Sequence, residues 1–379
     1  MKKQSRILAL ALVLALVLAL GMPLAINAAP SLSAKSAILI EAESGRVLYQ
    51  KNAFVRLPMA STTKIMTAIV AIESGDIGRT VSVSPDAVGI EGSSVYLYPG
   101  EKLTLEQLLY ALLLESANDA ATAIAIEVAG SVEAFADLMN QKAEALGLCA
   151  THFTNPHGLD HAEHYTTAYD LARIAAYALG NSTFRKICGA SRITVPLKGD
   201  EGTRVLVNHN KMLSRYRGAI GVKTGFTKKS GRCLVSAAER DGLTLVAVTL
   251  NAPDDWQDHE AMLDFGFARY ERVLLADKGE FTYALPLSGG NTETVLVANT
   301  TPLSVMLARD HGTITSRVEA PQMLLAPISQ GTVLGRVIYS CDGHDIAASD
   351  LVAIHQVTRQ KAEKQGLFAL LKRLIFQDQ

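Results

Sequence analysis

The chain has 379 residues, of which 49% are hydrophobic and 19% are charged, and its formal net charge is −1. This length and apolar content allow a sizeable core, in two domains or in one large domain. The near-zero charge argues against nucleic acid as a partner, and the sequence contains no Gly-rich phosphate-binding loop.

The first residues have the pattern of a secretory signal peptide. Basic residues among the first six precede an uninterrupted apolar run over residues 7–20, and the segment Ala25-Ile-Asn-Ala-Ala29 follows, with small residues at its end. A basic start, an apolar centre and a small-residue end are typical of a leader that is removed after export. We therefore expect residues 1–28 to be a signal peptide. The alternative is an uncleaved membrane anchor.

The cysteines are widely spread and include no Cys-x-x-Cys pair, so we expect no zinc or redox site built on them. An exported chain can form disulfides, and their pairing stays open. The cysteines are Cys149, Cys188, Cys233 and Cys341.

The exported part begins with the signals of a β-hairpin and a buried helix. Apolar runs at 37–41 and 46–49 flank Gly45, a residue that favours a turn. An apolar stripe then begins just after Ser61 and ends at Gly75, as in a largely buried helix.

Further helices follow in the middle of the chain. Thr104 and Gln107 have the spacing of a capping box, and Ser131 and Thr167 stand where helix-capping residues are expected. The predicted helices cover residues 104–115, 120–128, 131–146 and 167–179.

Strand signals return after the helices. Residues 233–239 and 243–250 read as two long strands joined by the tight turn Asp241-Gly242, and 259–267 reads as a helix. Shorter strand signals lie at 192–195 and 204–207. Two strands from the start and three from the end predict an α+β domain with a five-stranded antiparallel sheet and a helical cluster.

The composition changes twice more toward the end of the chain. The first domain is assigned to residues 29–274, and alternating short apolar runs and turn residues predict a small all-β domain over 275–358. In 359–379, apolar residues fall on one helix face and basic residues elsewhere, which predicts a helix that lies in a membrane surface. The alternative is a helix packed on its own domain.

Ser61 and Lys64 are the first candidate reactive pair. Residues three apart lie on one helix face, so the lysine amine can sit beside the serine hydroxyl. Burial makes the lysine lose its proton more easily, and a neutral amine beside a hydroxyl is a general base beside a nucleophile. Alone, a Ser-x-x-Lys motif is expected about once by chance in a chain of this length.

Two further motifs follow in order. Ser116-Ala-Asn118 lies at a turn between two helices, and Lys223-Thr-Gly225 lies on a strand before a hairpin. With Ser61-x-x-Lys64 they resemble the motif set of the penicillin-recognising serine enzymes. Within that superfamily the chain resembles the serine-type D-alanyl-D-alanine carboxypeptidases, the low-molecular-mass penicillin-binding proteins. The resemblance runs from about residue 34 to the tail and includes the stretches 112–119, 153–159, 165–170 and 208–213.

The resemblance implies a β-lactamase/transpeptidase-like fold, no cofactor and no metal. It implies that Ser61 forms an acyl-enzyme with the penultimate D-alanine of a peptidoglycan stem, that Lys64 takes its proton, and that Ser116 passes a proton to the leaving D-alanine. Asn118 would hold the substrate amide. The terminal carboxylate of the substrate would bind at the motif formed by Lys223, Thr224 and Gly225. The backbone N–H groups of Ser61 and Phe226 would form the oxyanion hole.

The same resemblance implies acylation by β-lactams and a location on the outer face of the cytoplasmic membrane or in the cell-wall space. The chain departs from many relatives at Ala117, Ile220 and Phe226. None of these departures removes a reactive group, but each can change rate or specificity.

Other functions stay open at this point. A β-lactamase shares the three motifs, but class A enzymes need a glutamate that this chain does not present in a Glu-x-x-Leu-Asn element. A D,D-transpeptidase or endopeptidase shares the acyl-enzyme, and a non-catalytic wall sensor shares the fold. A zinc peptidase is the chemical rival, because the loop around Asp160 and Glu163 is rich in histidine. These histidines are His152, His157, His161 and His164.

Overall fold

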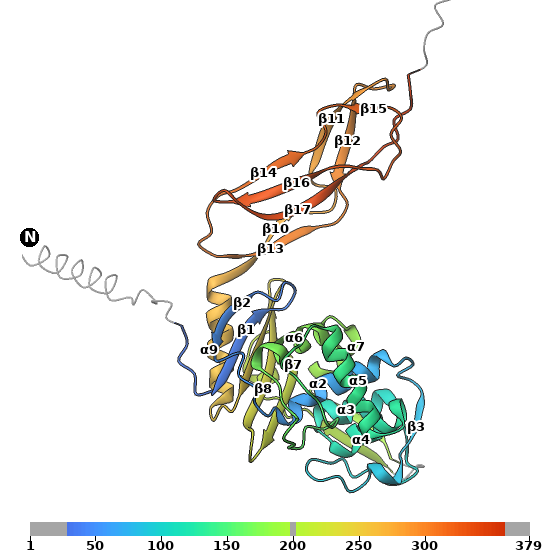
Figure 1. Cartoon of the computed structure of the whole chain (residues 1–379), viewed down its shortest axis with the longest axis vertical. Helices are drawn as coiled ribbons and strands as arrows, with labels where there is room; N and C mark the ends of the chain where they lie inside the picture. The colour runs from blue at the N-terminus through green and yellow to red at the C-terminus, as the bar shows by residue number, and fades with distance from the viewer. Residues whose placement is uncertain (1–28, 198–201, 361–379) are drawn as a thin grey trace, which may run out of the picture. The chain divides into compact units, whose positions relative to one another are not determined.

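The computed structural model describes residues 29–197 and 202–360. The expected signal peptide over 1–28 and residues 361–379 of the expected membrane helix lie outside the described residues. The chain divides into two compact units, the first ending at Ala268 and the second beginning at Arg269 (Figure 1). Among the described residues, no helix is long and apolar enough to cross a membrane.

The first unit is built on one five-stranded antiparallel sheet of order β2-β1-β9-β8-β7. The two N-terminal strands therefore join three strands from the end of the unit, which confirms the predicted α+β class and five-stranded sheet. The strands are β1 (Ser36–Glu41), β2 (Val47–Lys51), β7 (Ala219–Thr227), β8 (Gly231–Arg240) and β9 (Leu243–Leu250).

Helices cover both faces of this sheet. Ile38 and Ile40 belong to the core that the helical cluster shares, whereas Leu39 points to the opposite face, as strand alternation requires. Helix α9 (Asp255–Arg269) covers that second face at Gly266, where an added Cβ would lie 2.5 Å from a methyl carbon of Leu245. The sheet is thus buried from both sides, which holds the edge strand β7 in a fixed place.

The helical cluster follows the predicted caps. Thr104 and Gln107 form the capping box of α3, and the side chains of Ser131 and Thr167 cap α5 and α6. Helix α7 was not predicted, because it has only eight residues and a mixed polar sequence. The helices are α2 (Lys64–Glu73), α3 (Leu105–Leu114), α4 (Asn118–Ala129), α5 (Val132–Ala145), α6 (Ala168–Leu179), α7 (Ser182–Gly189) and α8 (Met212–Arg215).

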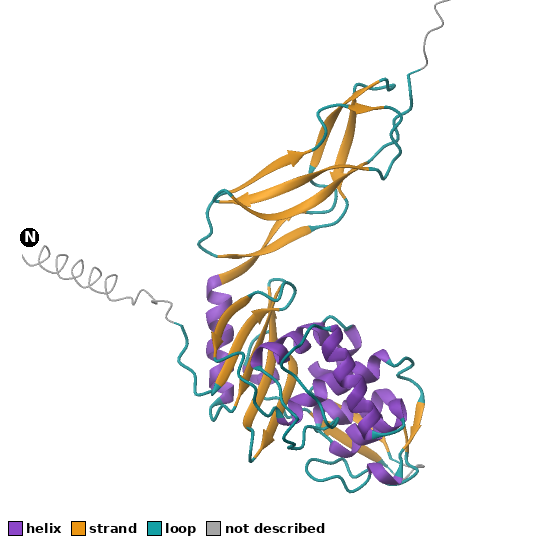
Figure 2. Cartoon of the chain, viewed as in Figure 1, coloured by secondary structure: helices purple, strands orange, loops and turns teal. Residues whose placement is uncertain are grey.

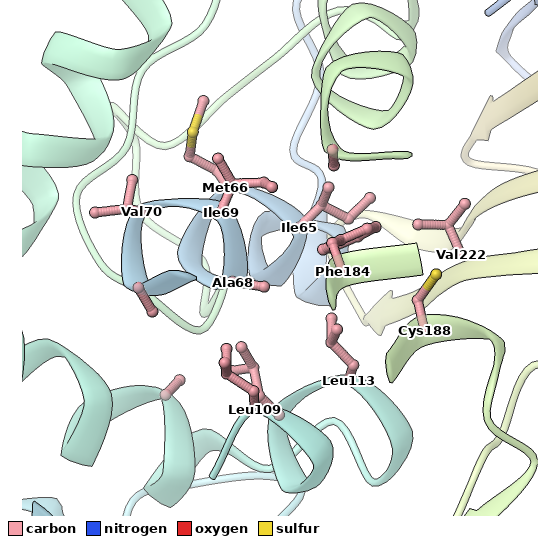
Figure 3. Close-up of a cluster of buried hydrophobic side chains, with 14 of the residues drawn as sticks. Ile65, Met66, Ala68, Ile69, Val70, Leu109, Leu113, Phe184, Cys188 and Val222 are labelled. Carbon is pink, nitrogen blue, oxygen red and sulfur yellow. The ribbon is translucent and has the colours of Figure 1, made fainter. Parts of the chain in front are cut away.

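Helix α2 lies at the centre of the cluster. Ile65, Met66 and Ile69 are at most 1% exposed, and Figure 3 shows Ile65 beside Phe184 of α7 and Val222 of β7, with Leu109 and Leu113 of α3 facing the other side of the helix. Just before α2, the chain forms one turn of 3₁₀ helix, η1 (Ala60–Thr63), so Ser61 precedes the α-helix that Lys64 begins. Burial of α2 on all sides fixes Lys64 relative to that turn.

Small elements complete the first unit. The predicted strands at 192–195 and 204–207 are present but form a separate ribbon instead of joining the main sheet. A second short ribbon stands before α3. These elements are β5 (Arg192–Pro196) with β6 (Thr203–Val207), β3 (Thr80–Ser82) with β4 (Lys102–Thr104), and the 3₁₀ turn η2 (Pro85–Ala87).

The described part of the second unit contains strands and loops only (Figure 2). One sheet has the order β14-β16-β17-β12-β11-β15, and β10 pairs with β13. Its own core includes Leu285, Val297, Val337 and Leu351. The strands are β10 (Tyr270–Ala276), β11 (Thr282–Ser288), β12 (Thr294–Asn299), β13 (Leu303–Ala308), β14 (Ile314–Glu319), β15 (Leu324–Leu325), β16 (Val333–Cys341) and β17 (His344–Ala353).

Candidate active site

Ser61 and Lys64 meet as the three-residue spacing predicts. The Nζ atom of Lys64 lies 3.0 Å from Oγ of Ser61, and the lysine side chain is fully buried. Two more oxygens surround the same nitrogen, Oδ1 of Asn118 and the carbonyl of His157, each at 2.7 Å. A carbonyl or amide oxygen can only accept a hydrogen bond, whereas the serine hydroxyl can donate or accept.

This environment favours a neutral lysine. Burial holds the pKa of Lys64 well below its usual value, and the nearby Lys223 lowers it further, while Asp119 acts in the opposite direction. A neutral amine has two N–H donors and one lone pair. The two donors match Asn118 and His157, which leaves the lone pair for the hydroxyl proton of Ser61. The geometry therefore presents a base that is aimed at the serine.

The loop that supplies the His157 carbonyl is anchored to η1 at close range. At Gly158, φ is +89° and an added Cβ would lie 1.9 Å from the carbonyl oxygen of Ala60, so glycine is required there. The Thr67 hydroxyl also donates to the Pro156 carbonyl at 2.6 Å. These contacts hold the oxygen of His157 on Lys64.

His164 ties the same loop to the serine turn. Its Nε2 lies 2.8 Å from Oγ1 of Thr63, and Nδ1 accepts the N–H of Thr154 at 3.0 Å. Because the Thr63 hydroxyl donates to the carbonyl of Ala60, Nε2 carries the ring proton and the imidazole is neutral. Burial lowers the pKa of His164 to about 3, which agrees with that state.

The histidine loop does not present a metal site within the described residues. Both nitrogens of His164 are committed to protein partners, and Nδ1 of His161 accepts the N–H of Glu163 at 3.1 Å. Among the described residues, no group of three or more His, Cys, Asp or Glu side chains is arranged to hold a metal ion. The zinc-peptidase alternative therefore has no support from this loop.

Ser116 and Asn118 lie at the junction of α3 and α4. Ser116 has φ of +60°, an uncommon backbone conformation for serine that directs this residue into the site. Asn118 is buried, and its Nδ2 donates to the carbonyl of Glu91 at 2.5 Å while Oδ1 faces Lys64. One proton of that amide nitrogen is left for another acceptor, as the expected contact with a substrate amide requires.

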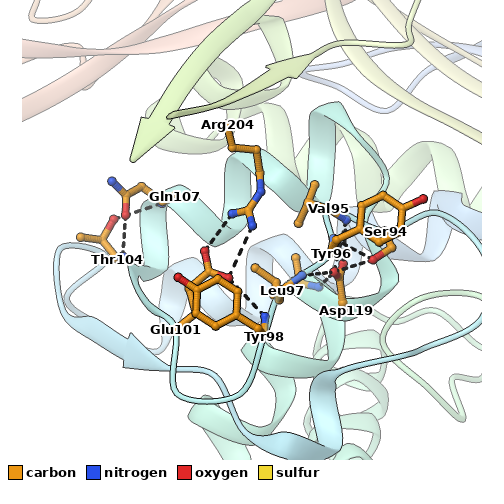
Figure 4. A network of polar contacts seen from close by, with 11 residues as sticks. Ser94, Val95, Tyr96, Leu97, Tyr98, Glu101, Thr104, Gln107, Asp119 and Arg204 are labelled. Carbon is orange, nitrogen blue, oxygen red and sulfur yellow. Dashed lines mark hydrogen bonds and ion pairs between the residues drawn. The ribbon is translucent and has the colours of Figure 1, made fainter. Parts of the chain in front are cut away.

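A carboxylate next to Asn118 holds the facing loop. The oxygens of Asp119 accept the N–H groups of Val95 and Leu97 and the hydroxyl of Ser94, at 2.7 to 3.3 Å (Figure 4). The buried Glu101 pairs with Arg204 at 3.0 Å in the same network. These contacts fix the loop that carries Glu91 and Ser93 over Asn118.

Strand β7 forms the other wall. At Gly225, an added Cβ would lie 3.1 Å from the backbone nitrogens of Ser61 and Thr62, so glycine lets the strand approach the serine turn. Lys223 is 1% exposed, and burial lowers its pKa to about 7. Its Nζ donates to the carbonyl of Thr224 at 3.0 Å. The close approach of Gly225 to the serine turn brings the two predicted oxyanion-hole residues near each other, with Ser61 on the turn and Phe226 next to Gly225 on β7.

A cleft of about 400 Å³ opens between these walls. Its lining includes five of the predicted site residues: Ser61, Ser116, Thr224, Gly225 and Phe226. Lys64, Asn118 and Lys223 do not line it, because each is at most 4% exposed and lies behind the surface.

The cleft also has a lining that we did not predict. Its members are Ser93, His209, Lys211, Arg232, Asp255 and Trp256. The stretch 208–213 was noted only for its resemblance. The contacts of these residues join segments far apart in sequence.

Known proteins are similar to this chain over most of its length. Residues 24–254 match the family model described as D-alanyl-D-alanine carboxypeptidase, and residues 270–359 match that of penicillin-binding protein 5, C-terminal domain. The D-alanyl-D-alanine carboxypeptidase DacF of Bacillus subtilis is 33% identical over 350 residues, which are 90% of this chain and 88% of that protein. DacA of Escherichia coli is 31% identical and covers 88% of this chain and 85% of its own.

Solved structures agree with these relatives. Penicillin-binding protein 5 from Haemophilus influenzae has a TM-score of 0.71 and 26% identity, and the match covers 88% of this chain and 99% of that one. The Streptomyces K15 DD-transpeptidase has a TM-score of 0.61 and 35% identity, over 64% of this chain and 99% of that one. With a full-length relative and a matching family model, the chain belongs to the D-alanyl-D-alanine carboxypeptidase family of serine peptidases, the low-molecular-mass penicillin-binding proteins.

Proposed function

We propose that this protein is a serine D,D-carboxypeptidase that removes the terminal D-alanine from peptidoglycan pentapeptide stems through an acyl-enzyme on Ser61. The observation that carries the proposal is the surroundings of Lys64. Its buried nitrogen lies 3.0 Å from the serine hydroxyl and is held by two oxygens that can only accept. Such a lysine is fixed in the role of a base for one particular hydroxyl.

In acylation, Lys64 accepts the proton of Ser61 as Oγ attacks the carbonyl carbon of the penultimate D-alanine. The carbonyl oxygen becomes an oxyanion, which the backbone N–H groups of Ser61 and Phe226 stabilise. When the oxyanion collapses, the C–N bond breaks and the leaving amine takes a proton from the hydroxyl of Ser116. The proton that Lys64 holds then returns to Ser116, so the protons balance.

Deacylation repeats the step with water as the nucleophile. Lys64 accepts a proton from water, hydroxide adds to the ester carbonyl, and the proton returns to Oγ of Ser61 as the ester bond breaks. A β-lactam enters the same first step, because its ring amide replaces the D-Ala-D-Ala amide and the ring-opened product stays bound to Ser61. The terminal carboxylate of either ligand would bind at Lys223 and Thr224.

The test measures free D-alanine released from a pentapeptide that ends in D-Ala-D-Ala. We expect release by the wild type, with or without a metal chelator, and no release by Ser61→Ala. Release that survives in Ser61→Ala and stops with the chelator would contradict the assignment. Mass spectrometry of a penicillin adduct on Ser61 provides the control for an intact site.

Transpeptidation is the second candidate, because a solved relative with 35% identity is named a DD-transpeptidase. The two reactions share the acyl-enzyme and differ in whether water or an amine resolves it. The measurement is the partition of product in the presence of an added acceptor amine such as glycylglycine. Hydrolysis predicts that free tetrapeptide stays the main product as the amine concentration rises.

We also propose that the protein acts outside the cytoplasmic membrane and is attached to it. The support is the sequence alone, with the leader pattern at 1–28 and the basic amphipathic pattern over 359–379. Fractionation of cells that produce the full chain, compared with a chain ending at Gln360, tests both parts. A tail-free chain that stays with the membrane fraction would contradict the proposed attachment.

A further inference from the structure

The second unit carries exposed apolar side chains at its edge strand β15. Leu325, the last residue of this strand, is 73% exposed, and Met323, which stands just before the strand, is 59% exposed. Strand β15 pairs in parallel with β11 and has no strand on its other side within the described chain. Both side chains therefore stand on an open border of the sheet, where a further surface can reach them.

These side chains belong to the outer face of a segment whose inner face is packed. Leu324 packs against the core of the second unit, and Ala326 belongs to that core. Because successive residues of an extended chain point to opposite sides, Met323, Leu325 and Pro327 point outward, and all three are exposed. The outward face of a solvated strand is normally polar. Here it is apolar, and we call these three outward residues the apolar tip.

The sequence around the apolar tip contains no charge. Between Glu319 and Arg336, no position is Asp, Glu, Lys or Arg. Water-exposed segments usually carry charged side chains, which oppose entry into an apolar phase because a charge that leaves water loses its hydration. This segment has no such barrier, and the transfer of its methionine and leucine side chains out of water is favourable. The chemistry of the tip therefore matches an apolar phase.

The tail of the chain starts beside the apolar tip. Nε of Arg359 donates to the carbonyl of Ala326 at 3.3 Å, and the N–H of Gln360 donates to the carbonyl of Gly289, which follows β11, at 2.9 Å. Leu325 pairs with the last residue of β11, so the tip and the last described residue share one end of the unit. In Figure 1, β11 and β15 stand at the end of the second unit where the described chain stops.

The tail has the basic amphipathic pattern that we expect to lie in a membrane surface. Its first large apolar residue, Leu367, is seven residues beyond Gln360. An extended chain spans at most about 3.5 Å per residue, so this linker reaches no further than about 25 Å. A tail that lies in lipid therefore holds the apolar tip within that distance of the same lipid surface. Chain continuity thus favours lipid over a protein partner as the surface that covers the tip.

We propose that the apolar tip inserts into the membrane surface that the tail occupies, and so gives the second unit a direct contact with lipid. This inference rests on the proposed membrane attachment. Two large apolar side chains are too few for stable anchoring by themselves. The tail supplies the attachment, and its short linker keeps the tip at a high effective concentration at the bilayer. The tip then slows dissociation and orients this end of the unit toward lipid.

The first experiment measures binding of the leader-free full chain to vesicles of equal parts phosphatidylglycerol and phosphatidylethanolamine. The double variant, Met323→Ser with Leu325→Ser, should bind about tenfold or more weakly, because its two apolar side chains no longer leave water on binding. The control is Leu274→Ser on β10, whose leucine is 58% exposed and lies outside the tip, and it should keep wild-type binding. Release of D-alanine should stay at the wild-type level in both variants.

The second experiment reports the environment of the tip directly. In the described chain, Cys149 is the exposed thiol and the other cysteines are buried, so Cys149→Ser provides a background for single labelling. A nitrobenzoxadiazole dye is then attached through Leu325→Cys or, as the control, through Leu274→Cys. Vesicles should shift the emission of the dye at position 325 to shorter wavelength and shield it from iodide in the water. They should leave the dye at position 274 unchanged.

The outcomes separate the tip from the tail and from the catalytic site. Vesicle binding that is equally tight in the double variant, with the dye at position 325 still in water, overturns the inference and leaves attachment by the tail intact. Absence of wild-type binding to vesicles overturns both and leaves the carboxypeptidase proposal to its own test. A dye at position 325 that is shielded without vesicles, and more so at higher protein concentration, would assign the tip to a second copy of the chain and overturn the lipid contact.

Discussion

Among the described residues, the first unit buries two lysine side chains, whereas the second unit buries no charged side chain. In the first, Lys64 and Lys223 are at most 1% exposed, and burial lowers the pKa of both. In the described part of the second, Asp345 pairs with Arg317 at 2.6 Å, and both side chains are about half exposed. Burying a charged group costs free energy, so burial in the first unit favours the neutral, reactive form of the lysine amine. The ion pairs in the described part of the second unit lie in solvent, where each contributes little to stability.

Removal of the proposed nucleophile should have the largest effect on activity, because the proposed reactive groups all lie in the first unit. Ser61→Ala should lower D-alanine release by about 10⁴-fold or more, because no acyl-enzyme can form. The matched change in the second unit, Ser340→Ala, removes a hydroxyl that donates to Asp345 at 2.8 Å and should leave release unchanged. Steady-state assays of both variants measure this. A comparable loss of D-alanine release in Ser340→Ala would show that the reaction does not depend on the first unit alone.

A glycine-to-alanine substitution should lower the free energy of unfolding by about 3 kcal/mol more at a tightly packed glycine of the first unit than at an open glycine of the second. Gly158→Ala should lower the free energy of unfolding by about 4 kcal/mol, because it combines backbone strain with overlap against the carbonyl of Ala60. Gly343→Ala, at φ +81° with no atom within 4 Å, should cost about 1 kcal/mol from strain alone.

Urea denaturation measures both glycine variants, with the single tryptophan, Trp256, as the probe of the first unit and circular dichroism for the whole chain. Equal costs for the two substitutions would show that the approach of the His157 loop to η1 is looser than described.

Substrate affinity should depend on pH through Lys223. Its pKa of about 7 means that the ammonium is present below pH 7 and lost above it in the free enzyme. The KM for a peptide with a free terminal carboxylate should therefore rise by about tenfold between pH 6 and pH 9. A β-lactam methyl ester, which lacks that carboxylate, should show no such rise in the concentration that gives half-maximal acylation. A flat KM for the peptide would remove Lys223 from carboxylate binding.

The smallest effect is expected from the surface pair of the second unit. Arg317 holds the pKa of the Asp345 carboxyl below its usual range, so the ion pair is present at neutral pH and lost as pH falls through that lowered pKa. Asp345→Asn should leave the thermal midpoint at pH 7 within the error of calorimetry, because both groups are exposed. A clear drop would show that this unit also depends on its charges.

The local features of the site could be predicted from the sequence, whereas its long-range contacts could not. The three-residue spacing of Ser61 and Lys64 led directly to a contact of 3.0 Å, and the capping box at Thr104 was confirmed. The carbonyl of His157 on Lys64 joins residues 93 positions apart. No periodic pattern encodes such a contact, because it depends on how a loop packs on a distant turn.

The same reason explains the other differences. The strands at 192–195 and 204–207 carry ordinary strand signals, but their sequence does not say which sheet they join. The ion pair between Arg232 and Asp255 joins the start of β8 to the start of α9, and no local sequence pattern predicts it. Helix η1 is a single turn, and a pattern with period 3.6 cannot distinguish it from the start of α2.

The burial of Lys64 makes reactivity a property of the folded state alone. In an unfolded chain this lysine is an ordinary ammonium with a pKa of about 10.4, and Ser61 is an ordinary alcohol. The base exists only once residues as distant as His157 and Gly225 have closed around the serine turn. By the proposed function, a fluorescent penicillin labels Ser61 only in native molecules, so the amount of label should measure refolding even in a mixture with misfolded copies.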